Sequence, residues 1–236
     1  MSAAMNYILD KRPDVIVLAG DWWDMPSLSA YEKAGSKYFE GKSYRQDIEA
    51  GLCGMETFLA PLNALNAARK KTKHKPWKPR IVFTTGNHED RITRVIRNEP
   101  KLDGALGLHD LKLESFGIEV HPFLKIAEID SVAYSHYFYN PLTGKVWTGS
   151  ADNMLARIGF TFTMGHRQGK QIADRALGNG KTQRALIAGS FYAHTEAYRG
   201  PQATNEWRGC IFKTEVRDGT YDLVELSLDY LLKKWL

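Results

Sequence analysis

The chain has 236 residues, of which 43% are hydrophobic and 25% are charged, and this composition excludes an intrinsically disordered protein. The formal net charge of +5 is too small to identify a partner by itself. No apolar run reaches the roughly 18 residues that a membrane-spanning helix needs, so we expect no membrane partner.

Cysteine usage bears on the location of the protein. Cys53 and Cys210 share no metal-type spacing, and the first residues are too polar and charged for a signal peptide. We therefore expect two free thiols in a reducing compartment, and a cytoplasmic protein.

Helices and strands alternate in the first half of the predicted structure. A helix is expected over 5–12, ended by Pro13, and continuous β-branched runs at 14–19 and 80–85 predict strands buried on both faces. Between these strands, apolar residues recur at a helical period from Ser43 to Lys71. A further helix is expected over 89–98, with two acidic residues in its first turn.

The second half has shorter elements. Strands are expected around 117–121, 124–129, 131–136 and 160–164, with a helix at 151–159. Two hairpins with glycine turns follow, at 170–191 and 207–228. Because no linker interrupts the chain, we expect a single α/β domain over 1–236 with mixed sheets, a helical insert at about 30–78 and C-terminal hairpins at about 169–230.

Metal-capable side chains follow four of the predicted strands. They are Asp21 after Gly20, Asn87 with His88 after Gly86, His136, and His166 after Gly165. One such residue is usually a turn former, but four in the same local context indicate a site, since α/β proteins build sites outside the carboxyl ends of strands. A carboxylate, an amide oxygen and imidazoles suit manganese, iron, zinc or magnesium-like ions.

The four segments "GDWWD", "GNHED", "SH" and "GHRQ", in this order, resemble the calcineurin-like metallophosphoesterase family. The resemblance covers essentially the whole chain from about Asp14. It implies a layered α-β-β-α sandwich with mixed sheets and a site for one or two divalent metal ions at the strand ends. Manganese is the first expectation, with zinc, iron, nickel or magnesium as alternatives.

The resemblance also implies roles for individual residues. Asp21 would bridge two metals, and the second metal would be completed by Asn87, His136 and His166. His88 would protonate the leaving oxygen or stabilise its charge, oriented by Asp24. Arg91 would contact a phosphoryl oxygen, and Gln168, where the family usually has histidine, would offer a weak oxygen to the first metal.

The family's D-x-H motif does not precede Asp21 in this sequence. Three explanations remain open: a chain that starts late and is N-terminally truncated, an enzyme that uses one metal or borrowed ligands such as His194, and a fold kept for binding alone. A missing strand would leave an open sheet edge, which predicts a homo-oligomer.

The expected function is hydrolysis of phosphodiester bonds by attack of metal-activated water. The basic stretch 68–80, together with the aromatic residues Tyr31, Tyr38, Phe39 and Tyr44, favours DNA or RNA as substrate, although a solvated connection and a packing face would have the same composition. The alternatives are a catalytically weak or inactive scaffold of the same fold and a phosphatase of nucleotides or small phosphomonoesters.

Overall fold

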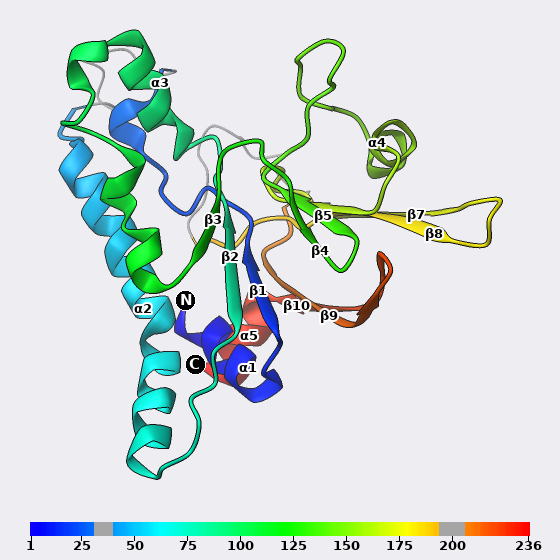
Figure 1. The fold of residues 1–236 in the computed structure, drawn as a ribbon, viewed down its shortest axis with the longest axis horizontal. Helices are drawn as coiled ribbons and strands as arrows, with labels where there is room; N and C mark the ends of the chain where they lie inside the picture. Colours follow the sequence, from blue (N-terminus) through cyan, green and yellow to red (C-terminus); the bar gives the residue numbers. More distant parts are fainter. Residues whose placement is uncertain (31–39, 194–205) are drawn as a thin grey trace. The chain divides into compact units, whose positions relative to one another are not determined.

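The computed structural model describes residues 1–30, 40–193 and 206–236 of a mixed α/β protein (Figure 1). The chain divides into two compact units. Unit 1 comprises Met1–Phe123 with Trp235–Leu236, and unit 2 comprises Leu124–Lys234. The expectation of a single domain stays a prediction. No helix in the described ranges is long and apolar enough to cross a membrane.

Unit 1 contains a parallel three-stranded sheet in the order β1 (Val15–Leu18), β2 (Arg80–Thr84) and β3 (Glu119–His121). The central strand β2 is buried from its second residue onward, as predicted. Burial of β1 on both faces was wrong, because only Ile16 is buried. Among the described strands, β1 pairs with β2 alone and is therefore an edge strand. The predicted homo-oligomer stays a prediction.

The helices of unit 1 lie where the apolar periodicity predicts them. Helix α1 (Ser2–Lys11) ends at Arg12, whose left-handed backbone precedes Pro13. Helix α2 (Tyr44–Lys71) begins at Ser43, whose hydroxyl accepts a hydrogen bond from the backbone N–H of Gln46. Helix α3 (Asp90–Asn98) follows β2 directly, and the short 3₁₀ helices η1 to η4 cover Pro26–Leu28, Pro100–Leu102, Leu108–Leu111 and Leu113–Phe116.

Two tryptophans hold the segment after β1 against α2. The Trp23 indole is buried and donates to the carbonyl of Ile48, and the Trp22 indole donates to the carbonyl of Gly51 at 3.0 Å. A Cβ atom at Gly51 would lie 1.9 Å from the Trp23 ring nitrogen, so only glycine allows this approach. The tryptophans thereby fix the path of the loop that carries Asp21 and Asp24.

Unit 2 contains a mixed five-stranded sheet in the order β4 (Ala127–Ile129), β5 (Val132–Ser135), β6 (Phe162–Met164), β8 (Thr182–Ile187) and β7 (Gln171–Ala176). The three central strands β5, β6 and β8 are parallel, and the outer strands pair antiparallel. Helix α4 (Ala151–Ile158) contacts β7 and β8.

Both predicted hairpins are confirmed. The first is β7 with β8, and the second is β9 (Gly209–Arg217) with β10 (Thr220–Ser227), which helix α5 (Leu228–Trp235) follows. Asp218 and Gly219 both have positive φ at the second turn, which is the backbone that tight hairpins favour. Cys53 and Cys210 are free thiols, as predicted.

A half-buried lysine joins the second hairpin to the sheet of unit 2. The Lys213 ammonium on β9 donates to the hydroxyl of Tyr134 on β5 at 3.0 Å and to the hydroxyl of Thr163 on β6 at 2.5 Å. It also lies over the rings of Tyr134 and Tyr221. Burial, with a smaller contribution from the charge of Arg184, lowers the pKa of Lys213 to about 7.

Candidate functional site

The loops that follow β1 and β2 meet at one edge of the unit 1 sheet. A Cβ atom at Gly20 would lie 2.5 Å from the carbonyl oxygen of Thr84, and one at Gly86 would lie 2.2 Å from the Asp21 carboxylate. Glycine at both positions lets the two backbones approach, and Asp21 itself has a left-handed backbone with φ 54°. Parallel pairing of β1 and β2 therefore brings Asp21 beside the "GNHED" segment.

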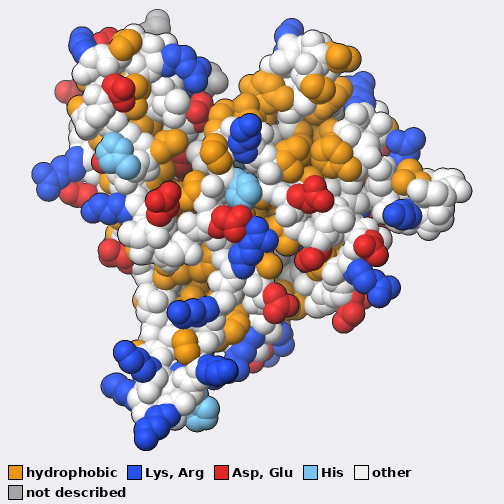
Figure 2. Space-filling view, viewed as in Figure 1, with side chains coloured by type: hydrophobic (Ala, Val, Ile, Leu, Met, Phe, Trp, Pro, Cys, Tyr) orange, Lys and Arg blue, Asp and Glu red, His pale blue; other side chains and the backbone are white. Residues whose placement is uncertain are grey.

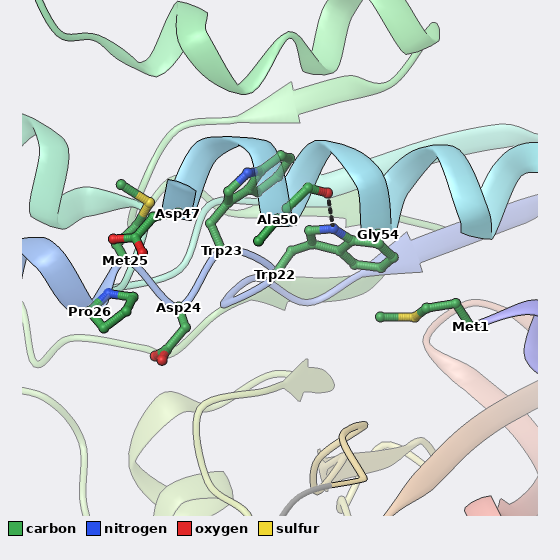
Figure 3. Close-up of a pocket in the computed structure, with 10 residues that line it drawn as sticks. Met1, Trp22, Trp23, Asp24, Met25, Pro26, Asp47, Ala50 and Gly54 are labelled. Atoms are coloured by element: carbon green, nitrogen blue, oxygen red, sulfur yellow. Dashed lines mark hydrogen bonds between the residues drawn. The ribbon is translucent and has the colours of Figure 1, made fainter. Parts of the chain in front are cut away.

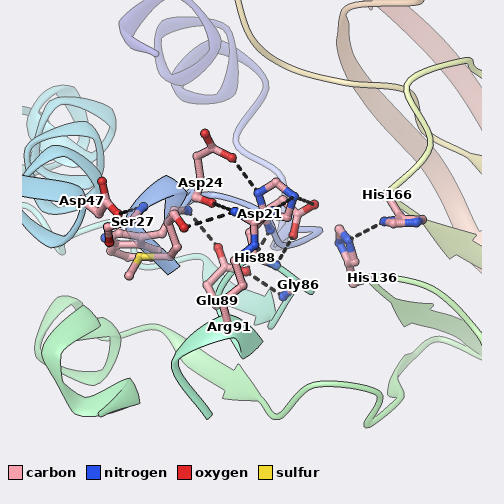
Figure 4. A network of polar contacts seen from close by, with 12 residues as sticks. Asp21, Asp24, Ser27, Asp47, Gly86, His88, Glu89, Arg91, His136 and His166 are labelled. Atoms are coloured by element: carbon pink, nitrogen blue, oxygen red, sulfur yellow. Dashed lines mark hydrogen bonds and ion pairs between the residues drawn. The ribbon is translucent and has the colours of Figure 1, made fainter. Parts of the chain in front are cut away.

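A buried glutamate ties these two loops together. Glu89 is 0% exposed, and its carboxylate accepts hydrogen bonds from three backbone N–H groups (Figure 4). The donors are Asp21 at 3.0 Å, Trp23 at 2.9 Å and Gly86 at 2.8 Å. Sequence reasoning missed this role and assigned Glu89 to the first turn of a helix. The signal that could have revealed this role is the position of Glu89 directly after Asn87 and His88 in the "GNHED" segment.

His88 is oriented by contacts on both sides of its ring. Its Nδ1 atom lies 2.7 Å from the Asp24 carboxylate, and its Nε2 atom lies 3.2 Å from the Arg91 guanidinium (Figure 4). Because a guanidinium can only donate, Nε2 accepts from Arg91, and Nδ1 carries the proton that is donated to Asp24. This hydrogen bond is the largest cause that lowers the pKa of Asp24.

The main chain of His88 also contacts the candidate metal ligand. Its backbone N–H donates to the Asp21 carboxylate at 3.0 Å, and its Nε2 atom lies 3.9 Å from the second Asp21 oxygen. The imidazole is therefore held between Asp21 and Asp24. An imidazole whose ring is fixed by a carboxylate in this way is a candidate for proton transfer.

Arg91 is buried and bonded within unit 1. Its guanidinium donates to the carbonyls of Asp24 at 3.0 Å and Met25 at 3.1 Å, in addition to His88. These bonds fix the loop that carries Asp24. Its predicted contact with a phosphoryl oxygen stays a prediction.

In unit 2, two histidines lie side by side at the ends of adjacent parallel strands. His136 follows β5 and is 1% exposed, and His166 follows β6 and is exposed, with φ 61°. The His136 Nε2 atom lies 3.2 Å from the His166 Nδ1 atom (Figure 4). Two ring nitrogens that face each other in this way are suitable ligands for one cation.

The remaining residues predicted for the site are divided between unit 1, unit 2 and the ranges outside the described structure. Asn87 is half-buried beside His88 in unit 1, and the backbone carbonyl of Gln168 in unit 2 accepts from the N–H of Trp207. The Tyr44 hydroxyl donates to Asp110 at 2.6 Å, which is a packing role. His194, Tyr31, Tyr38 and Phe39 lie outside the described residues.

A cavity adjoins the Asp24 side of the network in unit 1 (Figure 3). Its volume is about 300 Å³, and its lining includes Met1, Trp22, Asp24, Asp47 and Gly54. The Asp47 carboxylate accepts from the N–H of Ser27 at 2.9 Å. This mostly apolar space lies directly beside the residue that orients His88.

Comparison with known proteins gives two distant relatives and no family. No family model matches the chain. The chain is 28% identical over 192 residues to the "Gene 54 protein" of Mycobacterium phage L5, an alignment that covers 79% of this chain and 69% of that protein. It is 27% identical over 192 residues to the "Gene 54 protein" of Mycobacterium phage D29, with the same coverage. Neither name states an activity.

Proposed function

We propose that this chain is a metal-dependent phosphoesterase of the calcineurin-like class that hydrolyses phosphodiester bonds. The observation that carries the proposal is His88, held between the carboxylates of Asp21 and Asp24 at the ends of two parallel strands. Such an imidazole is suited to the hydrolysis of phosphate esters, because it can protonate the departing oxygen or stabilise its charge. The layered α-β-β-α sandwich is part of the same proposal.

The donor types at the strand ends fit a divalent cation. Asp21 and Asn87 offer oxygen in unit 1, and His136 and His166 offer nitrogen in unit 2. We propose that these four residues hold one shared ion, with manganese as the first candidate. When bound, the ion would supply Lewis acidity and a hydroxide-like nucleophile at neutral pH.

The residues of the chain itself perform the proton transfer in this proposal. Asp24 fixes the ring of His88 through Nδ1, so Nε2 faces the reacting group. Nε2 accepts from Arg91 in the structure, and donation to a leaving oxygen requires the protonated imidazole. The Asp24 carboxylate keeps the ring in its orientation through the bond to Nδ1.

A second candidate is a metal-binding scaffold without turnover. It is favoured by Gln168, because an amide oxygen is a weaker ligand than the imidazole expected at that position. A protein with only the shared ion would neutralise less charge on the phosphoryl group than a two-metal enzyme. The two candidates therefore differ in turnover and agree in metal binding.

The test compares turnover with metal content. The protein is incubated with Mn²⁺ and either bis(p-nitrophenyl) phosphate or p-nitrophenyl phosphate, beside His88→Ala and the control His109→Ala, which changes an exposed histidine of unit 1. We expect hydrolysis of the diester that is lost in His88→Ala and kept in the control. Folded protein that binds Mn²⁺ and hydrolyses neither compound would overturn the enzyme proposal in favour of the scaffold.

A further inference from the structure

The C-terminal end of α2 and the loop after it carry five exposed lysines. This lysine cluster is Lys70, Lys71, Lys73, Lys75 and Lys78. No acidic residue occurs between Asn63 and Arg80, and no ion pair joins the cluster to a carboxylate in the described part of the chain. Figure 2 shows Lys and Arg side chains gathered at the end of the molecule that α2 forms in Figure 1. The cluster is a concentrated positive surface.

The loop that presents the cluster is folded against α2. Asn66 and Trp77 exchange two hydrogen bonds of 2.8 Å, from the Asn66 amide to the Trp77 carbonyl and from the Trp77 N–H to the Asn66 carbonyl oxygen. The Arg69 guanidinium donates to the carbonyl of Lys75 at 2.6 Å, and the N–H of His74 donates to the carbonyl of Arg69 at 2.8 Å. The lysines of the loop are therefore displayed on a fixed backbone.

We propose that the lysine cluster binds the sugar–phosphate backbone of a nucleic acid, as a second contact remote from the reacting phosphate. Five exposed ammonium groups on one helix end and a folded loop suit a polymer that carries many negative charges. Each phosphate that a lysine neutralises releases counterions, which supplies sequence-independent affinity.

The length of α2 sets the distance between the cluster and the loop of Asp24. The Trp22 indole contacts α2 at Gly51, and eighteen positions separate Gly51 from Arg69, the residue directly before the cluster. At a helical rise of 1.5 Å per residue, this separation is about 27 Å. A duplex that rises 3.4 Å per base pair spans it with about 8 base pairs. Nucleic acids shorter than this cannot reach both contacts.

Binding can be tested without catalysis. Fluorescein-labelled DNA duplexes of 6 to 20 base pairs are titrated with the full chain in EDTA, and anisotropy is measured at several salt concentrations. The cluster variant replaces all five lysines by glutamine. The control variant makes the same change of net charge at five other exposed lysines, namely Lys112, Lys125, Lys145, Lys181 and Lys233.

The logarithm of the binding constant falls linearly with the logarithm of the salt concentration, with a slope of about −0.9 for each neutralised phosphate. For wild type, we expect the five lysines of the cluster to contribute roughly −4 to −5 to this slope. The cluster variant should lose most of this slope and bind at least tenfold more weakly, while the control variant keeps it. Unchanged affinity and slope in the cluster variant would overturn the proposal. Equal affinity for anionic lipid vesicles or poly-glutamate would overturn it as well. DNA and RNA of equal length, single-stranded and duplex, identify the preferred form.

The length requirement for cleavage rests on the proposed phosphoesterase function. With Mn²⁺, we expect efficient cleavage only of duplexes longer than about 8 base pairs, and the cluster variant should lose this length dependence while its turnover of bis(p-nitrophenyl) phosphate is unchanged. If wild type does not hydrolyse the chromogenic diester, the phosphoesterase proposal fails, and the titrations in EDTA still decide the lysine cluster. A length dependence that persists in the cluster variant would contradict the second contact.

Discussion

Replacement of Glu89 tests whether one buried carboxylate holds the candidate site together. Glu89→Ala removes the acceptor of three backbone N–H groups, and the bonds of Trp23 and Gly86 lie fully in the interior. Each buried donor left without an acceptor costs about 1–3 kcal/mol, so we expect a loss of about 3 kcal/mol or more in the free energy of unfolding. Glu89→Gln should cost less, because its carbonyl oxygen can still accept from two donors while its amide group faces the third.

The assay is urea unfolding followed by tryptophan fluorescence and by far-UV circular dichroism. A loss of 3 kcal/mol corresponds to a decrease of about 1–3 M in the urea midpoint for a typical slope of 1–3 kcal/mol per M. The control is Glu56→Ala, an exposed change on α2 that should stay within about 0.5 kcal/mol of wild type. A Glu89→Ala protein as stable as this control would refute the role of the carboxylate.

Three further predictions concern His88, Lys213 and the glycines of α2. His88→Ala should reduce turnover roughly 10²- to 10⁴-fold with unchanged metal content by elemental analysis, and loss of the metal would contradict its role as general acid. Because the pKa of Lys213 is lowered from 10.5 to about 7 on folding, the unfolded state binds an extra proton between about pH 7 and 10.5. Wild-type stability should therefore rise by up to about 1.4 kcal/mol per pH unit more steeply than that of Lys213→Met, as measured by urea unfolding, and equal slopes would be evidence against the neutral lysine. Gly51→Ala should destabilise by about 1–3 kcal/mol through the clash with Trp23, whereas Gly54→Ala, with its nearest contact at 3.5 Å, should be neutral or stabilise by up to about 1 kcal/mol. Equal melting temperatures of the two glycine variants would show that the close packing is absent.

Helices and strands could be predicted from the sequence where apolar residues on one face of the segment follow a regular period. The period of apolar residues located α2, because Ile48, Met55, Phe58 and Leu62 all point into the core of unit 1. The same reasoning overestimated the burial of β1, because an apolar run does not reveal whether a strand lies in the middle of a sheet or at its edge.

Partners distant in sequence could not be predicted where no recognised motif marked both residues. In the sequence, Glu89 is one charged residue at the start of a predicted helix. In the structure, it accepts hydrogen bonds from Trp23 and Asp21, which lie 66 and 68 positions away. In the sequence, Lys213 is one polar residue in a predicted hairpin. In the structure, its ammonium is surrounded by hydroxyl groups and rings from β5, β6 and β10. By contrast, the pairing of His88 with Asp24 was predicted, since the "GDWWD" and "GNHED" segments fix both the residues and their strands.

The central proposal is that Asp21, Asn87, His136 and His166 share a divalent cation, and anomalous diffraction at the manganese edge tests it most directly. Crystals grown with Mn²⁺ should give an anomalous peak within about 2.5 Å of an oxygen of Asp21 and of Asn87 and of a ring nitrogen of each histidine. Saturating Mn²⁺ without a peak at these four side chains, or with the peak held by other residues, would contradict the proposal.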